Sequence, residues 1–255
     1  MIKTLQYQYA LWRIALSFFT RIPVKFTGEI ATDMFHQASR YFALVGLFIG
    51  CLLAAFFYFA QLVFPAEISV ILTIAANLLL TGAFHEDGWA DVWDGFGGGW
   101  SVEQKLNIMK DSRLGTYGAS ALCLALLLKY QSLLVLNNSL CLVLYAIIFA
   151  NTVSRMAATS LIFSMDYVTE DAKSKVKPVT KNLSLASLFM LMGTSLVVLL
   201  AGVALNIVSI NQACLLIVSV FIARYIMQVW FHSQLKGYTG DCLGAAQIFI
   251  ELIVY

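Results

Sequence analysis

Charged residues are scarce in this sequence, because Asp, Glu, Lys and Arg make up only 12% of its 255 residues. Soluble domains carry about 25%. The hydrophobic share is 60%, so we expect an integral membrane protein. Because a net charge of +2 does not indicate the strongly basic surface that binds nucleic acid, we expect no nucleic-acid partner. The five cysteines form no CxxC pair, which argues against a zinc site and favours small buried apolar side chains.

Apolar runs of about 20 residues, the length that crosses a bilayer, recur along the chain. They are Tyr41–Phe64, Ile68–Phe84, Leu114–Leu136, Leu140–Phe163, Leu183–Leu205 and Gln212–Phe231. Ala245–Tyr255 is too short to span and predicts a partial or re-entrant helix, while Leu5–Phe19 predicts an interfacial or partially inserted helix. We expect an all-α fold, a polytopic transmembrane helical bundle of about six or seven membrane helices, with residues 1–255 as one domain.

The connections between these runs sort by positive charge. Thirteen of the sixteen Lys and Arg residues lie in residues 1–40, 86–113, 164–182 and 233–244. The connections Phe64–Glu67, Asn137–Ser139 and Asn206–Asn211 contain none. The positive-inside rule therefore places the charged connections in the cytoplasm. We therefore expect a chain that crosses the membrane several times, with the acidic residues on the cytoplasmic side.

Acidic residues gather in one charged connection, between Phe84 and Trp100. Glu86, Asp87, Asp91 and Asp94 fall within nine positions of this segment. In a helix, the last three share one face within roughly 60°, as a stripe about 10 Å long. Like charges at this spacing repel. The pattern predicts a Mg²⁺ site at Asp87, Asp91 and Asp94, shared with a phosphate-bearing substrate; the alternative is a solvated acidic turn.

Other polar residues are candidates for substrate binding. Lys110, Asp111 and Arg113 follow the acidic segment, where cations can bind phosphate oxygens or simply anchor the chain at the interface. Arg155 lies within an apolar run and either faces a polar cavity or snorkels to the surface. Glycines surround Thr239 and Asp241, which predicts a turn that presents both side chains to a substrate.

This combination of acids and cations at one membrane face suits phosphoryl transfer at a diphosphate, because that reaction needs mainly positioning and charge neutralisation. Asp91 or Asp94 can also accept the proton of an attacking hydroxyl. We therefore predict Asp91 and Asp94 as catalytic residues. The predicted substrate-binding residues are Glu86, Lys110, Asp111, Arg113, Arg155, Thr239 and Asp241.

Several segments together resemble the cobalamin synthase family, the adenosylcobinamide-GDP ribazoletransferases. The matching stretches are Phe18–Pro23, Tyr41–Gly46, His85–Gly99, Met109–Gly118 and Tyr238–Ala246. The resemblance implies that α-ribazole 5′-phosphate, or α-ribazole, displaces GMP from adenosylcobinamide-GDP to form adenosylcobalamin 5′-phosphate, or adenosylcobalamin. It also implies Mg²⁺ as cofactor, a location in the bacterial inner membrane, and a late step of cobalamin (vitamin B12) biosynthesis. The oligomeric state stays open, a homo-oligomer included.

Two alternative functions compete with this one. A CDP-alcohol phosphotransferase of lipid synthesis shares the start of its motif with Asp91-Val92-Trp93-Asp94-Gly95, but the Ala-Arg that should follow is absent. A cation-coupled transporter would carry its carboxylates near the membrane midplane, within spans. Release of GMP from a GDP-linked substrate would distinguish the transferase from both.

Overall fold

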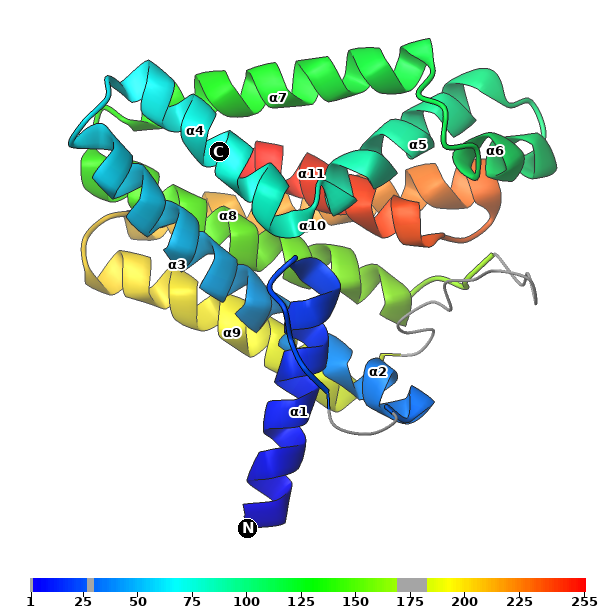
Figure 1. Ribbon diagram of the computed structural model, residues 1–255, viewed down its shortest axis with the longest axis horizontal. Helices are drawn as coiled ribbons and strands as arrows, with labels where there is room; N and C mark the ends of the chain where they lie inside the picture. The colour runs from blue at the N-terminus through cyan, green and yellow to red at the C-terminus, as the bar shows by residue number, and fades with distance from the viewer. Residues whose placement is uncertain (1, 27–29, 169–182) are drawn as a thin grey trace.

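The computed structural model describes residues 2–26, 30–168 and 183–255, and these form an all-helical bundle (Figure 1). The first helices are α1 (Ile2–Phe19), α2 (Thr32–Ala38), the 3₁₀ turn η1 (Ser39–Tyr41), α3 (Phe42–Gln61), α4 (Ala66–Thr81), α5 (Phe84–Gly98) and α6 (Val102–Met109). They are followed by α7 (Thr116–Leu136), α8 (Leu140–Ser160), η2 (Leu161–Phe163), α9 (Leu185–Ala204), α10 (Ile210–Leu235) and α11 (Gly240–Val254). The expected all-α membrane fold is confirmed.

The described residues contain five helices long and apolar enough to cross a membrane. They are Asp33–Gln61, Thr116–Leu136, Leu140–Phe163, Leu185–Ala204 and Ile210–Leu235. The number becomes six if α4 and α5, which meet at an angle of 89°, are counted as one broken span. α1 and α11 are not among these candidates.

The apolar run Ile68–Phe84 is helical only up to Thr81, and it counts toward a span only if α4 and α5 are taken together as one broken span. α4 ends at Thr81 because Gly82 adopts a left-handed conformation with φ of 69°, and its N–H donates to the carbonyl of Leu78. This is a common way for a helix to end, since glycine has no Cβ to oppose positive φ. Ala83 also has positive φ, at 54°. The chain therefore turns sharply before α5 begins, and α5 leads away from the membrane segment.

The C-terminal helix is longer than its apolar run predicts. α11 begins at Gly240, five residues before Ala245, because Thr239 accepts a hydrogen bond from the N–H of Cys242 as the N-cap. Such a cap satisfies a helix donor that would otherwise be unpaired.

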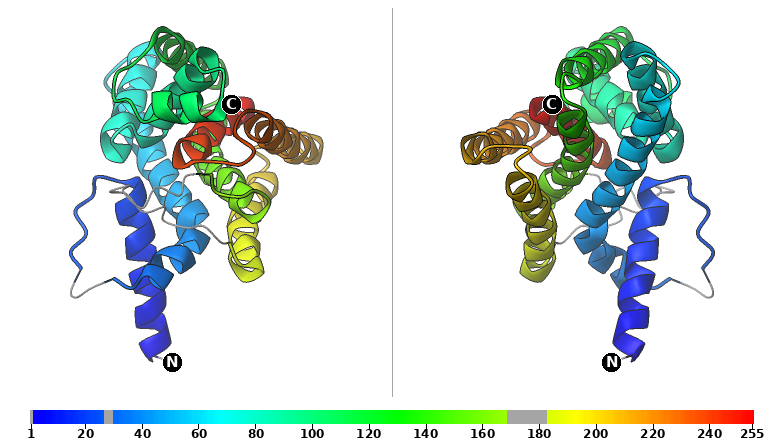
Figure 2. Two further views of the ribbon diagram at one scale, coloured as in Figure 1. Left: turned by 90° about the vertical axis from the view of Figure 1, so that its right-hand side faces the viewer. Right: turned by 90° about the vertical axis from the view of Figure 1, so that its left-hand side faces the viewer.

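The first helix, α1, projects from the bundle: its N-terminal end points away from the other helices in both views of Figure 2.

The two ends of the bundle differ as the charge sorting predicts. At one end, the α3–α4 and α7–α8 connections meet, and Gln61 Nε2 donates to Asn137 Oδ1 at 2.8 Å. At the other end, Lys105 of α6 donates to Gln234 of α10 at 2.6 Å. Figure 1 shows the connections α3–α4, α7–α8 and α9–α10 together at the left and α5–α6 and α10–α11 at the right. Most of the charged stretch 164–182 lies outside the described residues.

The centre of the bundle depends on close contact between α3 and α8. A Cβ on Gly46 would overlap the backbone oxygen of Asn151, and one on Gly50 would lie 2.7 Å from Cα of Ile148. Small residues of this kind let membrane helices approach until their backbones touch, which increases van der Waals contact. α8 is therefore the central helix, and most of its residues are buried.

We expect Gly46→Ala to destabilise the protein, because the added methyl group must push α3 away from α8. The matched control is Gly193→Ala in α9, where a Cβ would meet nothing within 4 Å. Alanine is otherwise the better helix former by about 1 kcal/mol, so the control should melt at the same or a higher temperature. The measurement is thermal unfolding in detergent; equal melting temperatures would contradict the close α3–α8 contact.

The arrangement of the connections also predicts which sites share a side of the membrane. Asn138 and Ser233 are both exposed and lie at opposite ends of the bundle. In a background without the native cysteines, Asn138→Cys and Ser233→Cys should react with an impermeant thiol reagent from opposite sides of the membrane. Labelling of both from the same side would refute this topology.

Candidate active site

The predicted acidic stripe lies on one helix, α5. Because residues 84–98 are helical, Asp87, Asp91 and Asp94 share a face at the spacing that the sequence predicts. Asp87 is exposed, and Asp91 and Asp94 are partly buried. The opposite side of α5 is fixed in the bundle by Trp89, whose indole N–H donates to the carbonyl of Ala121 in α7 at 3.0 Å. The stripe is thus held on a rigid element.

A fourth carboxylate, Asp241, is brought to the stripe by α11. A Cβ on Gly88 would lie 2.9 Å from the backbone oxygen of Asp241, and one on Gly244 would lie 3.3 Å from that of His85. The backbones of α5 and α11 therefore touch, and only glycine permits this approach. The turn predicted around Asp241 is in fact the first turn of a helix packed on the acidic segment.

The electrostatics of the cluster show that its acids act on one another. Partial burial, followed by the charges of Asp241, Asp87 and Asp94, raises the pKa of Asp91 to about 7. Burial and the charge of Asp87 raise the pKa of Asp241 to about 6, against a lowering effect of the Thr239 hydroxyl. Both residues lie outside the five candidate spans. Like charges that cannot separate favour the neutral form, so this site attracts protons or cations.

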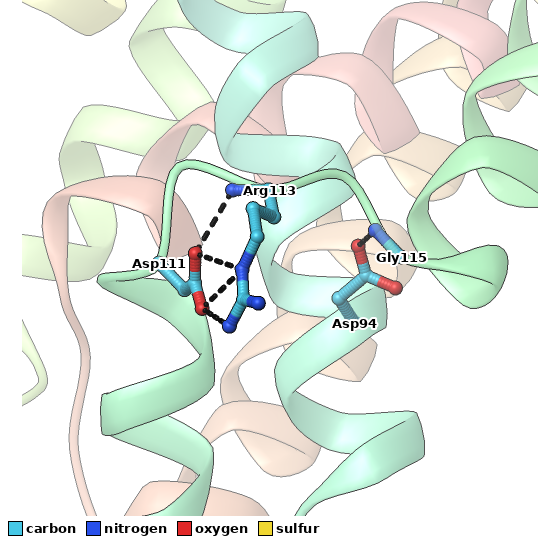
Figure 3. A network of polar contacts seen from close by, with 4 residues as sticks. All are labelled: Asp94, Asp111, Arg113 and Gly115. Atoms are coloured by element: carbon cyan, nitrogen blue, oxygen red, sulfur yellow. Dashed lines mark hydrogen bonds and ion pairs between the residues drawn. The ribbon is translucent and has the colours of Figure 1, made fainter.

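Asp94 has a structural partner that the sequence did not reveal. Its carboxylate accepts a hydrogen bond from the N–H group of Gly115 at 2.7 Å (Figure 3). It accepts a second one from the N–H group of Gly118 at 2.8 Å. These donors belong to the first turn of α7, and a carboxylate at that position also interacts favourably with the helix dipole. A Cβ on either glycine would overlap the Asp94 carboxylate. The Gly115-Thr116-Tyr117-Gly118 segment is the signal that could have indicated this contact.

The loop before α7 carries an exposed ion pair. The guanidinium of Arg113 binds both carboxylate oxygens of Asp111, with Nε at 3.0 Å from each and Nη2 at 2.5 Å from Oδ2 (Figure 3). These hydrogen bonds lower the pKa of Asp111 to about 2. The side chain of Arg113 is 87% exposed. The structure thus pairs Arg113 with Asp111 rather than with the stripe. Lys110, just before them, is exposed.

Three predicted substrate-binding residues lie inside the protein. Glu86 is 5% exposed and Arg155 1%. Arg155 Nη1 donates to the backbone and side-chain oxygens of Asn151 at 2.9 and 3.0 Å. Thr239 is 4% exposed and caps α11. The structure therefore does not bring these three side chains to the exposed face of the stripe.

Sequence reasoning missed an ion pair inside the bundle. Lys129 of α7 binds Glu251 of α11, with 2.9 Å between Nζ and Oε1. Neither residue is among the site residues that the sequence predicts. The available signal was the presence of two opposite charges within apolar runs, since such residues normally pair or mark functional positions.

The donors of the acidic cluster suit Mg²⁺ in type, because they are carboxylate oxygens. Among the described residues, no group of three or more Asp, Glu, His or Cys side chains is placed to hold a metal ion alone. Mg²⁺ is commonly held by one or two carboxylates together with water and substrate phosphates. The cluster therefore fits a metal that arrives with, or is completed by, a phosphate-bearing substrate.

Comparison with known proteins places the chain in a family. The model of a family described as cobalamin-5-phosphate synthase matches residues 11–255. A protein of Shewanella frigidimarina named adenosylcobinamide-GDP ribazoletransferase is 49% identical over 97% of this chain and 93% of its own length. One of the same name from Vibrio parahaemolyticus is 45% identical over 99% and 92%, and one from Shewanella amazonensis is 44% identical over 100% and 96%.

No solved structure matches this chain, so the fold described above stands on its own geometry. The family match covers both the acidic stripe of α5 and Asp241 of α11. The relatives carry one name and are matched over nearly their whole length. The chain therefore belongs to the cobalamin-5-phosphate synthase family and is a transferase of cobalamin biosynthesis.

Proposed function

We propose that the chain joins adenosylcobinamide-GDP to α-ribazole 5′-phosphate, or to α-ribazole, with release of GMP. The observation that carries this proposal is the convergence of Asp87, Asp91 and Asp241 at one end of the bundle, in a chain of this family. The reaction would take place at the cytoplasmic face of a bacterial inner membrane. That side is supported by the Lys and Arg residues, which favour the cytoplasm.

The bond changes follow from the products. GMP leaves with its own phosphate, so the phosphorus that is attacked is the one bonded to cobinamide. A ribose hydroxyl of the ribazole forms a new P–O bond to it, and the P–O bond to GMP breaks. The hydroxyl loses its proton, and negative charge develops on the leaving phosphate. The site must therefore accept one proton and stabilise that charge.

Asp91 is best suited to accept the proton. Its pKa of about 7 lies near the pH of the cytoplasm, where a general base is most effective. Asp94 is less suited, because its two oxygens already accept the N–H groups of α7. We therefore assign the base to Asp91 and a positioning role to Asp94.

Asp87 and Asp91, with Asp241 beside them, would hold Mg²⁺ together with the diphosphate. The bound ion would neutralise phosphate charge as the P–O bond to GMP breaks. The cluster supports this proposal, since the raised pKa values of Asp91 and Asp241 show an excess of negative charge that a divalent cation would relieve. Asp94 stays close enough to contribute through its charge.

Arg113 would bind phosphate oxygens at the mouth of the site. Its guanidinium is exposed, and Asp111 holds it in a fixed orientation on the loop that begins at Lys110. A guanidinium keeps further N–H donors when one carboxylate is bound, and its planar fork suits phosphate. Asp111 would thus act on the substrate through Arg113.

We expect Asp91→Asn to lose on the order of 10²- to 10⁴-fold in the rate of GMP release, the usual contribution of a general base. The substitution preserves size, so the variant should insert and melt like the unmodified protein. Glu67→Gln, at an exposed acid in the first turn of α4, is the matched control and should keep full activity. The assay is GMP release from adenosylcobinamide-GDP with and without Mg²⁺.

Asp94→Asn should differ by losing stability as well as rate. Its amide cannot accept both N–H groups of the α7 turn as a carboxylate does, and loss of such a cap costs about 1 kcal/mol. Near-normal activity of Asp91→Asn would remove Asp91 from the reaction. If Asp94→Asn melts at the same temperature as the unmodified protein, Asp94 does not stabilise the start of α7.

The raised pKa of Asp91 predicts how stability depends on pH without Mg²⁺. The folded state holds the proton up to about pH 7, whereas an unfolded aspartate releases it near its ordinary value of about 3.9. Stability is therefore lost as pH rises toward 7, and the protein in EDTA should melt at a higher temperature at pH 6 than at pH 8.

The same reasoning predicts that Mg²⁺ raises the melting temperature more at pH 8 than at pH 6, because protons compete for the carboxylates. In Asp91→Asn both differences should shrink. If the variant and the unmodified protein respond equally to pH and to Mg²⁺, Asp91 is not the titrating ligand.

A further inference from the structure

Opposite charges are buried together between α7 and α11, away from the exposed face of the acidic cluster. The side chains of Lys129 and Glu251 are 9% and 4% exposed, and their ion pair measures 2.9 Å. The hydroxyl of Tyr255 also donates to Glu251 Oε1 at 3.0 Å. Burial of two charges is costly unless they are paired and hydrogen-bonded. Inside a membrane protein such a pair usually has a function.

Glu86 of α5 belongs to the same interior group. It lines a cavity of about 10 Å³ together with Lys129 and Glu251, a space of about one water molecule. Its Oε2 atom is buried and has no hydrogen-bond partner among the described residues. Lys129 is the cation that acts most strongly on Glu86, followed by Arg155. Two acids and two cations thus balance one another in the interior.

Glu86 and Glu251 are the buried acids of the two helices that carry the site. We call the ends of α5 and α11 at which they lie the inner ends. Glu86 lies in the first turn of α5, directly before Asp87, whereas Glu251 lies in the last turn of α11, ten residues after Asp241. Gly88 contacts Asp241 and Gly244 contacts His85, so the helices run antiparallel. A shift of either helix along the other would separate Asp241 from Asp87 and Asp91.

We propose that Lys129 is a positioning residue that holds the inner ends of α5 and α11 together by binding Glu251 and neutralising Glu86. It thereby sets the distance between Asp241, in the first turn of α11, and Asp87 and Asp91 of α5. The proposal rests on the proposed function for its catalytic consequence. Its structural part rests only on the buried ion pair and the cavity.

Repulsion between the carboxylates of the cluster explains why the two helices need a residue that holds them together. The carboxylates at the outer end repel one another, which favours separation of α5 from α11. An apolar contact at the inner end would hold the helices but would tolerate sliding, whereas an ion pair in a low-dielectric interior is directional and sensitive to distance. Lys129, on α7, forms this ion pair. The first turn of α7 also binds Asp94 of α5 through a backbone N–H group.

The test compares two double variants with the unmodified protein. Lys129→Met with Glu251→Gln removes both charges at similar volume and should still fold, as neutral replacements of buried pairs often do. Lys129→Glu with Glu251→Lys reverses the pair and leaves a cation beside Glu86. Asn137→Ala, at the residue that follows the C-terminal end of α7, breaks the hydrogen bond with Gln61 and is the matched control.

The neutral variant should lose on the order of 10- to 100-fold in kcat, the cost of a small misplacement of catalytic groups, and should need more Mg²⁺ for its half-maximal rate. The reversed pair should recover most of both losses, and the control should lose neither. In hydrogen–deuterium exchange, which needs no substrate, amides of α11 should exchange faster in the neutral variant than in the reversed pair or the control.

A neutral variant that matches the unmodified protein in α11 exchange and in Mg²⁺ dependence would overturn the proposal. So would a reversed pair that performs no better than the neutral one. Absence of Mg²⁺-dependent GMP release in the unmodified protein is a different outcome, because it refutes the proposed function. The exchange measurement would then still decide the positioning role of Lys129.

Discussion

The contact between α5 and α11 is the constraint on which the candidate site depends. Their backbones meet at Gly88, where a Cβ would lie 2.9 Å from the backbone oxygen of Asp241 and require a shift, and at Gly244, where a Cβ would be in tight contact with His85 at 3.3 Å. This contact sets Asp241 against a stripe that already carries Asp87 and Asp91. The folded chain therefore adds the charge of Asp241 to the repulsion within the stripe. Burial, followed by these neighbouring charges, raises the pKa of Asp91 to about 7 and that of Asp241 to about 6.

The surrounding helices oppose this repulsion in two different ways. At the outer end, the first turn of α7 donates two N–H groups to Asp94, so one member of the stripe is neutralised by helix donors. At the inner end, Lys129 of the same helix binds Glu251. α7 thus contacts α5 at Asp94 and α11 at Glu251. Asp87, Asp91 and Asp241 keep an excess of negative charge, as a site for a cation and a diphosphate requires.

Much of the fold could be predicted from composition and periodicity. Apolar runs located the helices α3 and α7 to α10, because a lipid-exposed or buried helix must satisfy its own backbone groups. The same reasoning failed at Ile68–Phe84, where hydropathy continues but Gly82 and Ala83 turn the chain. It also missed the start of α11, since the cap residue Thr239 lies outside the apolar run. Positive φ at Gly82 and Ala83 decided the first boundary, and the side-chain cap by Thr239 decided the second.

For the site, the sequence by itself determined the stripe of Asp87, Asp91 and Asp94, because their spacing needs only a helix. It also identified Arg113, in the loop after the acidic segment, and Asp241, in a glycine-rich turn, as candidate substrate-binding residues. Only the tertiary structure decided that Asp241 joins the stripe, that Asp94 caps α7, and that Glu86 and Arg155 point inward. Lys129 and Glu251 are 122 residues apart in the numbering. Their pairing depends on how three helices pack, and the spacing within one helix carries no information about that packing.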